Sequence, residues 1–191
     1  WYQLTIEPNT LFHSKPPQLP DDENLWQIYE QGQKRLAELG YQQYEISAYA
    51  KEGYQCRHNL NYWQFGDYLG IGCGAHGKIT LINDNNVSDS KIIRTVKIKH
   101  PKGYLTADNY TYETTEVAQE DRALEYLMNR LRLMSPIPKV EFEQRTGLSR
   151  DTISDGIKQA CAKGLMTESD EHWQLTSKGH LFVNELLSQF L

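Results

Sequence analysis

The sequence predicts an α/β chain in two parts, residues 1–103 and residues 104–191. Three observations support this. A strand–helix–strand pattern opens the chain, a β-hairpin pattern follows it, and apolar residues recur at helical spacing from residue 118 onward. A length of 191 residues suffices for one large or two small domains with a real core. No run of about 18 apolar residues is present, so we expect no membrane-spanning helix.

The first part begins with an alternation of apolar and polar residues over positions 3–7, which predicts a strand. A helix should follow, with Asp21 or Asp22 as its N-cap and Gly40 at its end. Residues 41–47 then have the composition of a second strand. Because two strands joined through a helix usually lie parallel in one sheet, we expect a parallel βαβ unit here.

The N-terminal residues form neither a signal peptide nor a natural start, and no methionine precedes Met128. This predicts a fragment that begins inside a strand.

The three cysteines, Cys56, Cys73 and Cys161, are odd in number and widely spaced. This spacing favours free thiols and a reducing, cytoplasmic environment over a disulfide framework. We interpret Cys56 and Cys161 as small buried hydrophobic residues.

A β-hairpin is predicted where residues 78–83 and 91–99, both rich in strand-forming residues, flank an Asn-Asp-Asn-Asn turn signal. Residues 101–117 are polar and have no clear pattern, and we place the domain boundary at their start.

The second part reads as helix, helix, helix, hairpin, helix, an order that resembles a winged helix. Gly147 should end the second helix, and Ser149 should cap the third. A hairpin is expected over residues 165–175. Thr176 should cap a single last helix, with the apolar face formed by Phe182, Leu186 and Phe190.

The formal charge of −5 lies entirely in the second part. Residues 1–103 carry 11 basic and 11 acidic side chains, whereas residues 104–191 carry 9 and 14. A winged helix that binds DNA needs a basic surface, and the third helix mixes both signs. We therefore expect no DNA partner, although a nucleic-acid-binding module stays open as an alternative.

The most unusual stretch combines histidine, cysteine, glycines and aromatic residues: Cys-Arg-His-Asn-Leu-Asn-Tyr-Trp at 56–63, then Gly-Asp-Tyr-Leu-Gly-Ile-Gly-Cys-Gly-Ala-His-Gly at 66–77. Glycines permit close backbone approach, histidine and cysteine bind metals, and aromatic rings pack against flat ligands. In a helix, His58 and Tyr62 would share a face. From the residues alone, an isolated histidine such as His58 is usually a surface or a hydrogen-bonded residue, and a ligand role needs support from its neighbours. Gly70-x-Gly72-x-Gly74 lacks the context of a dinucleotide fingerprint.

The motif His-Asn-x-x-Tyr-Trp followed by Tyr-Leu-Gly-Ile-Gly-x-Gly-Ala-His resembles the haem-chaperone branch of the oxygen-independent coproporphyrinogen III oxidase-like proteins, which are radical S-adenosylmethionine proteins. The resemblance implies that the first part is the C-terminal portion of a partial (β/α) barrel with a β-hairpin region, followed by the mainly α winged-helix-like domain. It also implies that the protein binds haem and passes it to recipient haemoproteins, with a homodimer left open.

The resemblance carries over to particular residues. It implies a haem site at His58, Asn59, Tyr62 and Trp63, with His58 as the ligand of the haem iron, and Arg57 can pair with a propionate. Ile6 and His76 stand at the positions that contact S-adenosylmethionine in the related oxidase. The residue types at these two positions differ between the oxidase and this sequence.

The chain lacks a Cys-x3-Cys-x2-Cys loop, so we assign no catalytic residue and expect no radical chemistry from these residues. A [4Fe–4S] cluster and S-adenosylmethionine are expected only in the full-length protein. The main alternative is the oxidase itself, which decarboxylates two propionates of coproporphyrinogen III but lacks the His-Asn-x-x-Tyr-Trp motif.

Overall fold

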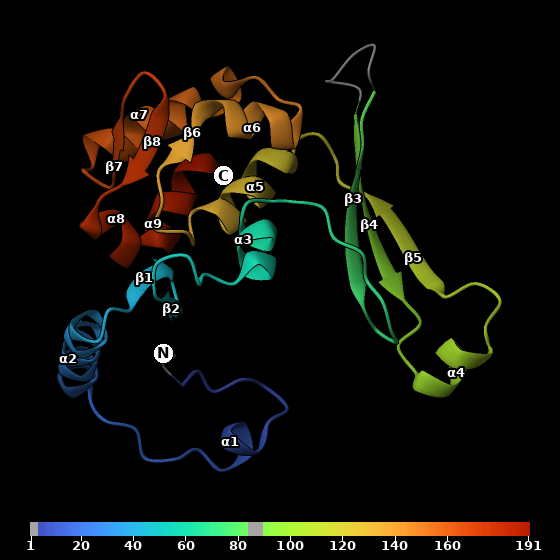
Figure 1. The fold of residues 1–191 in the computed structure, drawn as a ribbon, viewed down its shortest axis with the longest axis horizontal. Helices are drawn as coiled ribbons and strands as arrows, with labels where there is room; N and C mark the ends of the chain where they lie inside the picture. Colours follow the sequence, from blue (N-terminus) through green and yellow to red (C-terminus); the bar gives the residue numbers. More distant parts are fainter. Residues whose placement is uncertain (1–3, 84–89) are drawn as a thin grey trace. The chain divides into compact units, whose positions relative to one another are not determined.

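The computed structural model describes residues 4–83 and 90–191 (Figure 1). The chain forms two compact units, Trp1–Gln55 and Cys56–Leu191. The domain boundary predicted between residues 103 and 104 stays a prediction. Within the described ranges, no helix is both long enough and apolar enough to cross a bilayer.

The first unit contains two helices and a short hairpin: α1 Leu11–Ser14, α2 Asp22–Glu38, β1 Gln42–Glu45 and β2 Ala48–Ala50. The predicted boundaries of α2 are confirmed. The Asp21 carboxylate accepts a hydrogen bond from the backbone N–H of Asn24 at 2.8 Å, and Gly40 leaves the helix with a φ of +80°.

The predicted parallel strands are wrong for the described residues. Residues 4–7 form no strand, and β1 pairs antiparallel with β2, with Gln42 opposite Ala50. Position 3 of the predicted strand lies outside the described residues. A strand needs a partner for its backbone N–H and C=O groups, and a tight turn after Glu45 brings the next segment into that role.

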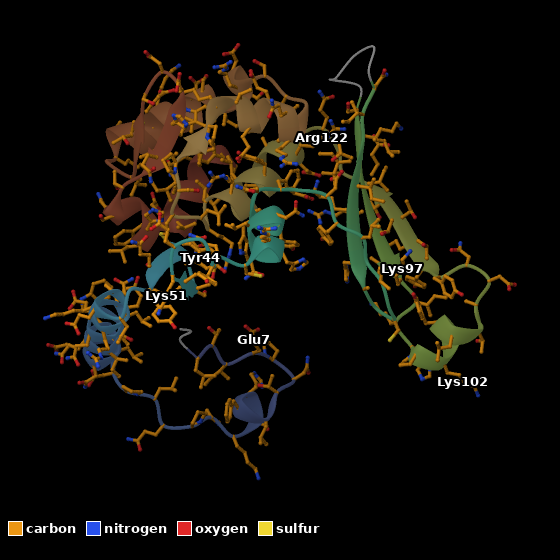
Figure 2. The ribbon with its side chains drawn as sticks, viewed as in Figure 1. Glu7, Tyr44, Lys51, Lys97, Lys102 and Arg122 are labelled. Carbon is orange, nitrogen blue, oxygen red and sulfur yellow. The ribbon has the colours of Figure 1, made fainter. Side chains whose placement is uncertain are left out.

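The second unit opens with α3 Arg57–Trp63 and continues into a three-stranded antiparallel sheet of β3 His76–Leu81, β4 Lys91–Lys97 and β5 Thr111–Glu116 (Figure 1). The predicted hairpin is confirmed as β3 and β4, while residues 84–89 of its turn lie outside the described residues. β5 and α4 Pro101–Thr106 arise from the region that had no clear sequence pattern. The Lys97 ammonium, labelled in Figure 2, donates to Thr111 Oγ1 at 2.9 Å and so joins β4 to β5.

The C-terminal elements surround the main core. They are α5 Arg122–Arg130, β6 Ile137–Pro138, α6 Lys139–Thr146, η2 Arg150–Ile153, α7 Ser154–Ala162, β7 Met166–Glu168, β8 His172–Leu175, α8 Ser177–Leu181, α9 Val183–Leu187 and η3 Ser188–Phe190. The short strands form a sheet in the order β6-β8-β7. Gly147 ends α6 with a φ of +71°, and the hydroxyls of Ser149 and Thr176 cap η2 and α8, all as predicted.

The single last helix that the sequence predicts is broken. Phe182 has a φ of −118° and a ψ of +40°, outside the helical region, and it separates α8 from α9. As a result Leu186 is fully buried whereas Phe182 is about half exposed, so the three predicted apolar residues do not share one buried face.

The core of the second unit draws apolar side chains from both its sheet segment and its helices. Phe65 and Ile92 are each 1% exposed and belong to the same cluster as Leu127 and Trp173. Cys161 packs half-buried against this cluster. Cys56 is exposed, so its predicted burial is wrong, because it precedes the open first turn of α3. All three cysteines are free.

Among the glycines of the C-terminal elements, Gly179 in α8 has the least room for a side chain. A Cβ there would stand 2.0 Å from the carbonyl oxygen of Leu165, a backbone atom that cannot move aside easily. We expect Gly179→Ala to lower the free energy of unfolding by about 1–3 kcal/mol, the usual cost of overpacking. Urea-induced unfolding followed by circular dichroism measures the change.

Gly103→Ala in α4 is the matched control, because its Cβ would meet only the flexible side chain of Ile98, at 3.4 Å. Equal effects of the two substitutions would contradict this description of the packing.

Candidate functional site

The stretch predicted to carry function forms α3, so the expected sharing of one helix face by His58 and Tyr62 is confirmed. Cys56 stands at the N-cap and makes no side-chain hydrogen bond to the backbone there. Its thiol instead contacts the Asn59 amide oxygen at 3.5 Å, as a weak donor.

His58 and Arg57 are available to a ligand. Both side chains are exposed, and neither makes a hydrogen bond or an ion pair with any described residue. The interpretation of His58 as a hydrogen-bonded residue finds no partner in the described part of the chain, whereas its exposure fits an ordinary surface residue as well as a ligand. The assignment of His58 to haem stays a prediction.

The aromatic side chains of this region form a cluster beside His58. Tyr62 meets Trp63 edge-to-face with ring centroids 4.9 Å apart, and Tyr68 lies against Tyr62 at 5.3 Å. The guanidinium of Arg132, just after α5, covers one face of Trp63 at 4.4 Å from the ring centroid. Tyr62 and Trp63 are half-buried, so the cluster is fixed by packing but still reaches the surface.

Phe65 and a buried ion pair secure the end of α3. The Phe65 ring packs edge-to-face on Tyr126 with centroids 6.0 Å apart, and the Lys78 ammonium lies 4.3 Å from the centroid of the Phe65 ring. Lys78, only 2% exposed, donates to Asp67 at 2.9 Å. The same carboxylate accepts two bonds from Thr80, each of 2.8 Å.

These contacts shift the ionisation of both partners. Burial alone would raise the pKa of Asp67, but the hydrogen bonds from Thr80 and Lys78 and the Lys78 charge together hold it below 3.8. Burial lowers the pKa of Lys78, and Asp67 opposes that shift. The pair therefore depends on Asp67 staying ionised.

Three glycines after α3 serve the chain's own packing. A Cβ on Gly66 would stand 2.2 Å from the side chain of Asn61, and one on Gly70 would stand 2.4 Å from the carbonyl oxygen of His76. A Cβ on Gly77 would meet Thr95 at 2.7 Å. These glycines thus let the loop fold tightly onto β3, rather than making room for a ligand as their type alone suggests.

The two positions predicted to contact S-adenosylmethionine lie in different units. Ile6 is half-buried in the first unit, and His76 is exposed at the start of β3, where it pairs with Val96. Their assignment stays a prediction. Within the described ranges, no group of three or more His, Cys, Asp or Glu residues is placed so that it could hold a metal ion.

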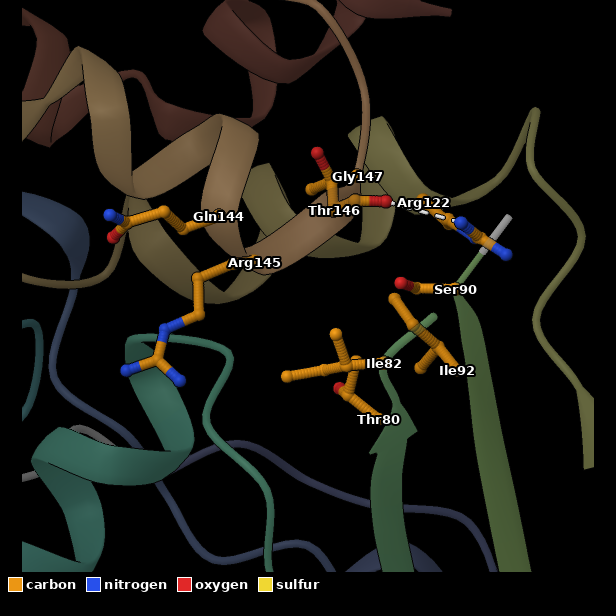
Figure 3. A pocket seen from close by; sticks show the side chains of 9 residues that line it. All are labelled: Thr80, Ile82, Ser90, Ile92, Arg122, Gln144, Arg145, Thr146 and Gly147. Carbon is orange, nitrogen blue, oxygen red and sulfur yellow. Dashed lines mark hydrogen bonds between the residues drawn. The ribbon is translucent and has the colours of Figure 1, made fainter. Parts of the chain in front are cut away.

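A separate cavity of about 260 Å³ lies between the β3–β4 hairpin and the C-terminal end of α6 (Figure 3). Buried Arg122 closes one side of it and donates to the carbonyl oxygen of Thr146 at 3.2 Å. Cofactor and drug-sized ligand sites usually measure about 300–1,000 Å³. The cavity is therefore too small to bury a porphyrin.

Sequence reasoning missed Asp67, Lys78 and Arg132, the side chains that hold this site in place. No periodicity marks them, because their partners come from other segments: Lys78 from β3 and Arg132 from the turn after α5. A lysine or arginine on a half-buried element is usually solvated, so residue type alone gives no signal for them.

Comparison with known proteins agrees with this description. Residues 117–182 match the family described as the HemN C-terminal domain. The fold is similar to a solved structure titled "Coproporphyrinogen III oxidase (HemN) from Escherichia coli is a Radical SAM enzyme", with a TM-score of 0.59 and 16% identity over 90% of this chain and 42% of that chain. This likeness concerns the fold alone.

The chain therefore carries a HemN C-terminal domain. It is similar to "Heme chaperone HemW" of Escherichia coli (strain K12), with 54% identity over the whole chain and 49% of the relative. The protein of the same name from Bacillus subtilis (strain 168) is 31% identical, again over the whole chain and 50% of the relative. The chain spans about half the length of these relatives.

The Asp67–Lys78 pair gives a test of how this site is supported. Asp67→Ala should lower the free energy of unfolding by about 2 kcal/mol, less than the 3–5 kcal/mol of a fully buried broken pair because Asp67 is partly exposed. A carboxylate whose folded pKa is depressed stabilises the fold above its unfolded pKa of about 3.8 and loses that effect as the pH falls through the folded value. The difference from wild type should therefore shrink below pH 3.8.

Asp155→Ala, which breaks the exposed Asp155–Lys158 pair, is the control and should leave stability unchanged. Chemical unfolding at a series of pH values measures both variants. A pH-independent difference for Asp67→Ala would count against the ion pair.

Proposed function

We propose that this chain is part of a haem chaperone, a protein that binds haem and delivers it to haemoproteins. The observation that supports it most is the exposed His58 on α3, which has no partner among the described residues and shares its helix with the Tyr62–Trp63 pair. The whole-chain similarity to proteins named "Heme chaperone HemW" points to the same cargo.

The side chains of α3 suit haem in three ways. The neutral imidazole of His58 supplies a nitrogen ligand for the haem iron. Tyr62 offers an aromatic wall one helical turn away, where burial of porphyrin surface contributes about 25 cal/mol per Å². Arg57 pairs with a propionate, and Asn59 adds a hydrogen-bonding amide. Because the ligand face of α3 is exposed, a recipient can approach the same haem and exchange the axial ligand.

The remaining parts of the proposal concern the full-length protein. The three cysteines of this chain lie far apart in the sequence, so residues outside it would bind a [4Fe–4S] cluster. S-adenosylmethionine would contact Ile6 and His76. The first part of the chain would complete a partial (β/α) barrel, and the C-terminal elements would form a winged-helix-like domain. A cytoplasmic location fits the free cysteines.

Oxidase activity is not favoured. The likeness to coproporphyrinogen III oxidase rests on fold at 16% identity, whereas the similarity to heme chaperones extends over the whole chain at 54% identity. The free histidine of α3 fits a role in carrying haem.

DNA binding by the C-terminal elements is also not favoured, because the basic side chains around α7 are paired. Arg150 binds Glu143 at 3.1 Å, and the ammonium groups of Lys158 and Lys163 bind Asp155 and Glu185, each at 2.9 Å. Phosphate binding requires free Lys and Arg whose contacts release counterions.

We therefore expect no salt-sensitive binding of duplex DNA at physiological salt, as measured by fluorescence anisotropy. Binding near 1 µM that disappears on removing residues 118–191 would show the opposite.

The haem-ligand role of His58 is tested in the full-length protein by His58→Ala. We expect the Soret band to shift and haem affinity to fall about tenfold or more, since one axial bond is lost. The melting temperature should stay within about 1–2 °C of wild type, because the exposed side chain has no partner to lose. Absorbance titration with haem and thermal unfolding measure these quantities.

His100→Ala changes another exposed histidine, at the N-cap of α4, and should leave the haem spectrum as in wild type. An unchanged spectrum and affinity in His58→Ala would refute the assignment of His58.

A further inference from the structure

Two hydrogen-bond donors lie side by side at the end of α3 without an acceptor. The indole Nε1 of Trp63 and the guanidinium Nε of Arg132 are both buried, and neither has a hydrogen-bond partner in the described part of the chain. The Arg132 guanidinium stands 4.4 Å from the centroid of the Trp63 ring. Buried donors normally find an acceptor, so a stacked pair that lacks one suggests that the acceptor comes from outside.

Arg130, two residues earlier, is an arginine whose guanidinium donors have acceptors within the fold. Its guanidinium donates to Glu141 at 2.8 Å and to the carbonyl oxygens of Ser135 and Pro136. Arg132 makes none of these bonds and takes part in no ion pair that joins described residues. The positive charge of Arg132 is thus uncompensated beside α3.

The backbone around Arg132 is held firmly. Leu131 and Leu133 on either side are 0% and 1% exposed, which fixes the turn between them and directs the arginine side chain onto Trp63. The contact with the indole also restricts where the guanidinium can lie. A planar, pre-oriented guanidinium favours a carboxylate, which can accept two parallel bonds.

We propose that Arg132, held on Trp63, binds a propionate carboxylate of the haem cargo in the full-length protein. This inference rests on the proposed function and adds a second anchor to it, from outside the His-Asn-x-x-Tyr-Trp motif. It also changes the role of Trp63, because Arg132 occupies one face of its ring. Trp63 then supports the anion-binding arginine, and Tyr62 remains the aromatic wall for the porphyrin. Arg57 is exposed and unpartnered, and no packing orients it as packing orients Arg132.

The test compares haem with haem dimethyl ester, in which both propionates are esterified and uncharged. Each is titrated into full-length protein by absorbance, in the same buffer and detergent. Wild type should bind haem about tenfold more tightly than the ester, the effect of one charge-assisted hydrogen-bonded pair. Arg132→Gln should weaken haem binding about tenfold and leave ester binding unchanged, so the preference falls by the same factor and any remainder belongs to Arg57.

Three further variants separate the explanations. Arg132→Lys keeps the charge without the planar fork and should restore part of the preference, even where Arg132→Gln proves unstable. Arg150→Gln removes an arginine already paired with Glu143 and should keep the wild-type preference. His58→Ala should weaken haem and ester alike, so it also keeps the preference.

The outcomes are distinct. A preference for haem that is as large in Arg132→Gln as in wild type overturns the role of Arg132 while the haem-chaperone proposal stands. Equal weakening of haem and ester by Arg132→Gln shows that the arginine only supports Trp63, and also overturns the inference. A wild-type protein that binds neither ligand overturns the proposed function itself, and the inference with it.

Discussion

The second unit depends on one aromatic side chain, Phe65, which joins the candidate site to the core. It directly follows α3, is 1% exposed and packs on Tyr126 of α5. Its φ of +57° is unusual for a bulky residue and costs about 1–3 kcal/mol of local strain, which burial of the ring offsets. Lys78 covers Phe65, and Asp67 in turn neutralises Lys78. These successive contacts, from Phe65 through Lys78 to Asp67, hold the end of α3, the start of β3 and the helical core together.

This arrangement explains how α3 presents free side chains without being mobile. The helix is fixed at its C-terminal end, where Trp63 and Phe65 are packed, whereas its N-terminal turn with His58 and Arg57 is open to solvent. A carrier needs both properties. Its ligand must be oriented by a rigid element, and the ligand must stay accessible so that cargo can leave. The buried ion pair beneath the loop supplies the rigidity at a distance from the exposed face.

Local rules predicted the helix and turn boundaries well. Asp21, Ser149 and Thr176 cap the elements expected of them, and Gly40 and Gly147 end helices in the left-handed region. These features depend on hydrogen bonds between residues at most five positions apart, so the sequence contains all the information they need. Strand pairing was harder. The parallel unit failed because the choice of partner for β1 depends on which segment folds back against it.

The sequence by itself determined the motif, its spacing and the candidate metal-ligand chemistry of His58, because these are properties of adjacent residues. Only the tertiary structure decided which side chains support that motif. It showed that Gly66 and Gly70 serve close packing of the chain, that Lys78 is buried against Asp67, and that Arg132 lies on Trp63 without an acceptor. The physical reason is that burial and charge compensation arise between segments far apart in sequence, where no local pattern records which side chains will meet.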